Sequence, residues 1–238
     1  MSSEREFRLG YWMAIVVAVE VAVFAVELAW YLIAPSAAAN IVSYIACMLL
    51  APSFVTMIAC TPLVSREGSR SFTRAALGLA AMYGVLCAGN YYLQLSVLRL
   101  GTYSASADAL SLVRFTSGSP AFALDMLGYS FMCLSTLVLV PAITGKGAEK
   151  VLKIFCAING FLAVPTLVFT AMRFSQSGAG SSDAFGCVVL LFFCIIFLPV
   201  PIIFARLFRA KLKQASTGED RAPSLATAAG PSGRRPPG

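Results

Sequence analysis

Residues 11–33 read YWMAIVVAVEVAVFAVELAWYLI, and this stretch decides the fold. Nearly all of its residues are apolar, and Trp12 and Trp30 stand close to its two ends. The tryptophans are eighteen positions apart, roughly 27 Å along a helix that rises about 1.5 Å per residue. That length is close to the hydrocarbon thickness of a bilayer, and tryptophan is enriched at membrane interfaces. The stretch therefore predicts a membrane-spanning helix with an anchor at each interface.

Two glutamates interrupt this apolar stretch. Glu20 and Glu27 are seven residues apart, two helical turns, so they project from one face of the helix. Membrane helices tolerate carboxyl groups only where protein or water covers them, and a carboxyl removed from water favours its neutral form. Glu20 is thus a candidate proton donor near mid-membrane, with a hydrogen-bonded structural role as the alternative. Glu27 lies nearer the surface, and both roles stay open for it.

The composition describes an integral membrane protein. Of 238 residues, 58% are hydrophobic and 12% are charged, against about 25% charged in soluble domains. The net charge of +7 comes from residues between the apolar runs and in the tail, so we expect no nucleic-acid partner. The chain has no histidine, and its seven cysteines are scattered through apolar runs, so we expect no metal or other cofactor.

Five further apolar runs are long enough to span a bilayer, and they predict an all-α bundle of six transmembrane helices. They cover about residues 40–63, 75–98, 121–143, 151–172 and 184–207. The first run is longer than the apolar region of a signal peptide and is expected to be retained. We predict three parts: a cytoplasmic N-terminus (1–10), the six-span domain (11–208) and a disordered basic cytoplasmic tail (209–238). A short surface helix is expected around residues 105–115.

The distribution of basic residues predicts the orientation. Fifteen of the eighteen Lys and Arg residues fall in the two terminal segments and in the loops after the second and fourth spans. Arg99, Arg114 and Arg173 are the three on the opposite side. Because cytoplasmic loops are enriched in Lys and Arg, both termini are predicted to be cytoplasmic, in a multi-pass protein of the inner (plasma) membrane.

With this orientation, polar residues gather in the outer half of the predicted bundle. Asn90 and Gln94 share one helix face, Arg99 lies at the mouth of the third span, and Asp125 opens the fourth. We expect a pocket there that opens toward the outer leaflet or the extracytoplasmic side. The candidate substrate-binding residues are Asn90, Tyr91, Tyr92, Gln94, Arg99 and Tyr129, and the candidate acids are Glu20, Glu27 and Asp125.

A structural explanation competes with each of these candidates. Arg99 can pair with Asp125, and either of them can pair with Glu27, as clasps between spans. Arg173 ends the fifth span and is expected to extend its guanidinium to the interface. The tyrosines can be packing residues only. Asn159 is expected to lie deeper than the other polar groups.

Two segments, NYYLQLSVLR (90–99) and ALDMLGY (123–129), resemble those of a broad group of small, uncharacterised bacterial membrane proteins with six spans. The resemblance covers roughly residues 10–175, and it implies a fold without an activity.

More loosely, the chain is similar in size and in its intramembrane acids to small integral-membrane terpene cyclases. In those enzymes intramembrane carboxyls protonate an alkene or epoxide, and aromatic side chains stabilise the carbocation. The resemblance implies acid roles for Glu20, Glu27 and Asp125 and cation stabilisation by Tyr91 and Tyr92. It rests on no shared motif, and the fungal members have seven spans.

Three classes of function follow from these observations. The leading hypothesis is a membrane enzyme that acts on a lipophilic small molecule in the bilayer, specifically a terpene or isoprenoid cyclase. The second is a proton-coupled carrier or an export and resistance factor, in which Glu20 and Glu27 relay protons and Arg99 contacts an anion. The third is a structural membrane subunit whose charged residues form ion pairs that hold the spans together.

Overall fold

The computed structural model describes residues 2–34, 37–99, 107–115, 119–173 and 182–217, and helices dominate these ranges. The α-helices are α1 (Ser2–Ile33), α2 (Ala37–Ala59), α3 (Arg70–Leu93), α4 (Ala107–Val113), α5 (Pro120–Leu139), α6 (Ala148–Phe161), α7 (Ala163–Arg173), α8 (Ser182–Phe197) and α9 (Pro199–Thr217). Two 3₁₀ turns, η1 (Thr61–Leu63) and η3 (Val140–Ala142), follow α2 and α5, and a π-helical turn, η2 (Gln94–Leu98), follows α3.

Six stretches within the described ranges are long and apolar enough to cross a membrane, as the sequence predicts. The first four consist mainly of α1, α2, α3 and α5. The fifth joins α6 to α7, and the sixth joins α8 to α9. Both breaks precede a proline-containing helix, Pro165 in α7 and Pro199 at the start of α9, and proline disturbs the helical ladder.

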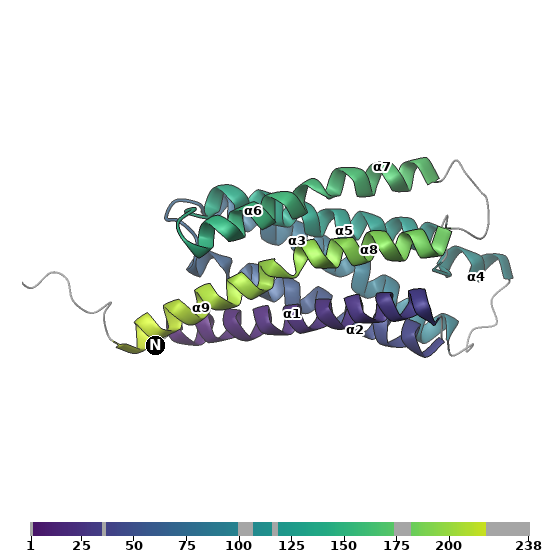
Figure 1. Ribbon diagram of the computed structural model, residues 1–238, viewed down its shortest axis with the longest axis horizontal. Coiled ribbons are helices and arrows are strands. Elements are labelled where there is room, and N and C mark those ends of the chain that lie inside the picture. Colours follow the sequence, from purple (N-terminus) through teal and green to yellow (C-terminus); the bar gives the residue numbers. More distant parts are fainter. Residues whose placement is uncertain (1, 35–36, 100–106, 116–118, 174–181, 218–238) are drawn as a thin grey trace, which may run out of the picture.

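The spans run side by side along the long axis of the molecule (Figure 1), and each contacts the next in chain order, with the sixth returning to the first. α1 packs on α2, α2 on α3, α3 on α5, and α5 on both α6 and α7; α6 meets α8 and α9, which return to α1. Most of the connections are short, which makes the spans that they join antiparallel neighbours; the connection between α3 and α5 is longer and contains α4. The start of α1 and the end of α9 lie at one end of the bundle, and α4 lies at the other. A single core of apolar and aromatic side chains fills the interior.

Small residues allow the spans to approach closely. A Cβ on Gly160 of α6 would lie 2.4 Å from Leu137 Cβ of α5, and one on Gly128 of α5 would lie 2.6 Å from Cys87 Sγ of α3. A Cβ on Gly84 of α3 would lie 3.1 Å from Val55 of α2. Close backbone approach of this kind drives helix association in lipid, where burial of apolar surface contributes little.

Two predictions concern segments outside the spans: one is confirmed and the other is wrong in part. The surface helix expected near residues 105–115 is present as α4. The tail was predicted to be disordered from residue 209, but α9 continues as a helix to Thr217. Residues 209–217 contain Arg209, Lys211 and Lys213, which are good helix formers on an exposed surface. Residues 218–238 lie outside the described ranges.

Candidate functional site

Asp125 is a buried carboxyl on the most buried of the six spans. Its helix begins at Pro120, and the Ser119 side chain caps it by accepting a hydrogen bond of 3.1 Å from the Phe122 amide. The Asp125 side chain is 0% exposed, and the Tyr91 hydroxyl donates a hydrogen bond of 3.0 Å to its Oδ2 atom. Its Oδ1 atom has no hydrogen-bond partner among the described residues.

A row of polar side chains continues from Asp125 across the bundle. The Tyr91 and Tyr129 hydroxyl oxygens are 3.3 Å apart, and the Tyr129 oxygen is 3.5 Å from Cys47 Sγ on α2. The Cys87 thiol lies on the other side, 3.9 Å from the backbone carbonyl oxygen of Asp125. We call these five residues the Asp125 cluster. It joins α2, α3 and α5, and all five side chains are buried.

One group of aromatic rings surrounds Tyr91 of the Asp125 cluster. The Tyr91 ring centroid lies 5.7 Å from that of Tyr44 and 6.0 Å from that of Phe115. Phe115 in turn lies 6.2 Å from Tyr44 and 5.6 Å from Phe122. Aromatic faces carry partial negative charge, so a positive group among these rings is stabilised.

A second group of aromatic rings surrounds Tyr129 of the Asp125 cluster. Tyr129 lies 5.9 Å from Tyr83 and 5.6 Å from Phe193, measured between ring centroids. Phe54 and Phe197 complete this layer, 5.6 Å from Tyr83 and 5.8 Å from Phe193 respectively. Spans two, three, four and six therefore meet through aromatic contacts at the centre of the bundle.

The two amides predicted to bind substrate are bonded to backbone groups instead. Asn90 Nδ2 donates a hydrogen bond of 3.0 Å to the carbonyl of Ala121 at the start of α5. Gln94 Nε2 donates a hydrogen bond of 2.6 Å to the Val113 carbonyl, and Gln94 Oε1 accepts one of 3.2 Å from the Phe115 amide. Both amides position elements around the Asp125 cluster.

Glu20 lies at a second place in the bundle. Ser53 Oγ of α2 donates a hydrogen bond of 3.3 Å to Glu20 Oε1, while Oε2 is buried and has no partner among the described residues. The buried hydroxyl of Tyr83 likewise lacks a described partner.

Three other candidates lie apart from the Asp125 cluster. Tyr92 is 61% exposed and faces outward, because it sits next to the inward-facing Tyr91 on a helix. Arg99 is exposed, and Glu27 is half-buried with no described partner. Within the described ranges Arg99 forms no ion pair with Asp125 or Glu27, and the ion pair that is present joins Arg8 to Glu4. The Arg173 side chain lies outside what the structure describes.

The deeper polar group predicted at Asn159 is present. Asn159 Nδ2 donates a hydrogen bond of 2.8 Å to Thr136 Oγ1, and Thr136 lies within 2.7 Å of the Cys133 carbonyl and 3.3 Å of the Cys156 carbonyl. This contact joins α5 to α6.

Sequence reasoning missed several residues of the cluster and its walls: Tyr44, Cys47, Tyr83, Cys87 and Phe115. A usable signal was present in α3, where Tyr83, Cys87 and Tyr91 recur every four residues and so share one face. Asp125 and Tyr129 repeat the same spacing in α5. Nothing local marks Phe115, which comes from the chain after α4.

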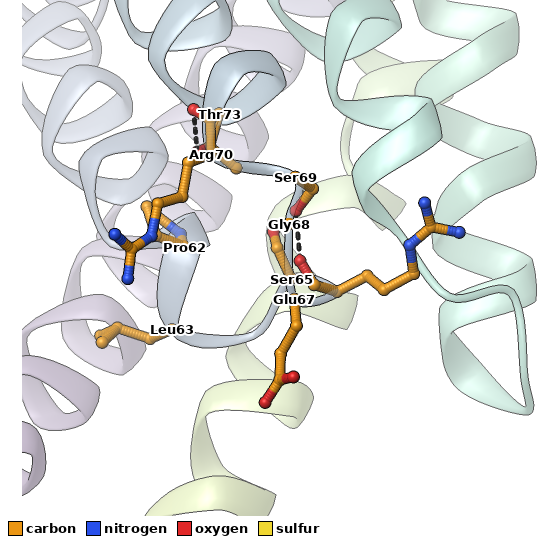
Figure 2. Close-up of a pocket in the computed structure, with 9 residues that line it drawn as sticks. Pro62, Leu63, Ser65, Glu67, Gly68, Ser69, Arg70 and Thr73 are labelled. Atoms are coloured by element: carbon orange, nitrogen blue, oxygen red, sulfur yellow. Dashed lines mark hydrogen bonds between the residues drawn. The ribbon is translucent and has the colours of Figure 1, made fainter.

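The pocket predicted in the outer half of the bundle stays a prediction. A groove of about 550 Å³ lies in the connection between α2 and α3, at the end of the bundle opposite α4. Figure 2 shows the Glu67 and Arg70 side chains pointing in different directions from this connection. The other residues that line it are Pro62, Leu63, Ser65, Arg66, Gly68, Ser69 and Thr73.

Within the described ranges, no group of three or more Cys, Asp or Glu side chains is placed to hold a metal ion. The arrangement instead offers a buried carboxyl, a tyrosine bonded to it and a set of aromatic faces. Such a carboxyl can donate a proton to a lipophilic molecule, and the aromatic faces can stabilise the cation that forms. Comparison with protein-family models, with curated proteins and with solved structures found no match to this chain.

Proposed function

We propose that this protein takes a lipophilic small molecule from the bilayer into the outer half of its bundle and protonates it with Asp125. The specific reaction is the cyclisation of a terpene or other isoprenoid. The carrying observation is the Asp125 carboxyl, which is fully buried, accepts a hydrogen bond from Tyr91 and has no ion pair among the described residues. A lone carboxylate is costly to bury, so such a group is held as the neutral acid.

In this reaction the Asp125 proton moves to an alkene carbon, which breaks the π bond, or to an epoxide oxygen, which opens the C–O bond; either step leaves a cationic carbon. The π electrons of a second alkene of the same molecule attack that carbon and form a carbon–carbon bond. A proton lost from the carbon beside the final cation returns to the Asp125 carboxylate and restores the acid, so no oxidant or reductant is consumed. The rings of Tyr44, Tyr91 and Tyr129 stabilise the cation through their faces.

The orientation belongs to the same proposal. The two ends of the bundle carry unequal charge, and the positive-inside rule assigns the end with both termini to the cytoplasm. The Asp125 cluster then lies in the outer half of a bacterial inner (plasma) membrane, where lipophilic substrates reach it from the bilayer.

The test is conversion of an acyclic polyprenyl alkene and of its terminal epoxide by the purified chain in detergent, with products identified by mass spectrometry. We expect Asp125→Asn to abolish cyclic product while the variant still purifies as a folded monodisperse protein. Tyr92→Phe, on the exposed face, is the control and should retain activity. Equal turnover by wild type, Asp125→Asn and Glu20→Gln would contradict the proposal.

A proton-coupled carrier is the second candidate, and Glu20 supports it. Glu20 and Asp125 are carboxyls on different spans, and intramembrane carboxyls form the proton relays of many transporters. A carrier needs a proton gradient, so it should accumulate a lipophilic substrate in sealed vesicles only when a gradient is imposed. An enzyme forms product in detergent, where no gradient exists. A structural subunit does neither.

A further inference from the structure

Phe115 occupies the outermost position against the Asp125 cluster. Its ring lies within 6.2 Å of the rings of Tyr44, Tyr91 and Phe122, measured between centroids. Tyr91 is also the donor to Asp125, so Phe115 is one side chain removed from the carboxyl. Unlike the other rings, Phe115 belongs to no span: it follows the short helix α4.

Gln94 ties this segment to the third span. Its amide group bonds twice, to the Val113 carbonyl and to the Phe115 amide, and so holds the backbone on both sides of Arg114. Gln94 itself begins the π-helical turn η2, and such turns occur frequently at functional sites. These are bonds between neutral groups, so they can break without leaving a buried charge.

We propose that Phe115 is a plug: its ring fills a subsite for the ligand's hydrocarbon group, and Gln94 is the latch that holds the plug in place. When Gln94 releases Val113 and Phe115, an unsaturated or aromatic hydrocarbon group replaces the Phe115 ring against Tyr44, Tyr91 and Phe122. The ligand class rests on the proposed function, whereas the plug and latch rest on the contacts alone.

The chemistry of the subsite selects the ligand. The rings of Tyr44, Tyr91 and Phe122 bound it, so the subsite offers the ligand apolar, π-rich faces. A flat group with π electrons makes the same ring contacts as Phe115. Such a group lies one side chain from Asp125, within reach of proton donation after a small movement.

Native thiols report whether the plug opens. Cys47 and Cys87 belong to the Asp125 cluster beneath Phe115, and Cys156 lies on α6; all three are free and 0% exposed. The full-length protein in detergent is treated with methyl methanethiosulfonate, and modification of each cysteine is followed by peptide mass spectrometry. The three rates are measured together in one sample.

We expect Gln94→Ala to speed modification of Cys47 and Cys87 by about tenfold or more, because two hydrogen bonds that oppose local opening are lost. Phe115→Ala should do the same, and Cys156 should stay at its wild-type rate in both. Thr136→Val, which breaks a buried contact near Cys156, is the control and should leave Cys47 and Cys87 unchanged. The plug proposal is overturned if the modification rates of Cys47 and Cys87 stay unchanged in both test variants. It is also overturned if the modification rate of Cys156 rises in parallel with theirs.

A second arm probes the subsite with naphthalene. Phe115→Ala should leave a ring-sized space, so naphthalene should slow Cys47 and Cys87 modification more strongly in that variant than in wild type, where the Phe115 ring competes for the subsite. Unchanged Cys47 and Cys87 rates in Phe115→Ala with naphthalene would overturn the assignment of the subsite. Neither arm measures turnover. Failure of the plug therefore shows in the thiol modification rates, whereas failure of the proposed function shows in the absence of cyclic product.

Discussion

The Tyr91 hydroxyl donates a hydrogen bond of 3.0 Å to Asp125 Oδ2 across the interface between α3 and α5. The oxygen of the same hydroxyl lies 3.3 Å from the Tyr129 hydroxyl oxygen on α5. One tyrosine thus links the candidate acid to the centre of the bundle. Its neighbour Tyr92 faces the opposite way.

Tyr91→Phe removes that hydrogen bond and leaves both Asp125 oxygens without a partner. We expect the unfolding free energy to fall by about 1–3 kcal/mol, the usual cost of an unsatisfied buried polar group. Unfolding in detergent with a chemical denaturant measures the change. Tyr92→Phe, at an exposed position, should fall within about 0.5 kcal/mol of wild type. Equal effects of the two substitutions would refute the buried pairing.

Gly160→Ala tests the contact between α5 and α6. The added Cβ would lie 2.4 Å from Leu137 Cβ and 2.9 Å from Leu137 Cα, so the two helices must separate. Overpacking of this kind costs about 1–3 kcal/mol, and we expect a lower thermal midpoint and lower yield. Gly78→Ala on α3 is the matched control, because its Cβ meets nothing within 4 Å. A stable Gly160→Ala protein would mean that these helices lie further apart.

Tyr83→Phe is expected to preserve or increase stability. The Tyr83 side chain is fully buried, and its hydroxyl has no hydrogen-bond partner among the described residues. Removal of an unsatisfied buried hydroxyl relieves a cost of about 1–3 kcal/mol while the ring contacts with Phe54 and Tyr129 remain. A clear drop in the thermal midpoint would show that the hydroxyl makes a stabilising bond.

Thr136→Val tests the deeper contact with Asn159. Valine has a similar shape but no hydroxyl, so Asn159 Nδ2 loses its acceptor at 2.8 Å. The expected loss is about 1–3 kcal/mol of unfolding free energy. Thr136→Ser keeps the hydroxyl and should lose less, and a reversed order would rule out the hydrogen bond as the cause.

The orientation is testable with an epitope tag after Gly238. Because α1 begins and α9 ends at the same end of the bundle, and that end carries most of the basic residues, the tag is expected on the cytoplasmic side. Antibody should bind it only after the membrane is permeabilised. Binding to intact spheroplasts would reverse the proposed topology and place the Asp125 cluster in the inner half.

The amino-acid sequence by itself determined the six spans and their approximate limits. The length and hydropathy of an apolar run are local properties, and the run bounded by Trp12 and Trp30 is long enough to cross a bilayer. The charge of the loops is local as well. Asp125 and Asn159 could be predicted as buried polar groups because each lies inside such a run.

Which face of each helix points inward was decided only by the tertiary structure. Lipid is as apolar as the protein core, so hydrophobicity does not distinguish the inner face of a span from the outer one. The packing of α3 between α2 and α5 therefore selected Tyr91 over Tyr92. It also brought Cys47 from α2, and Phe115 from beyond α4, to a carboxyl far away in sequence, through contacts that no local pattern encodes.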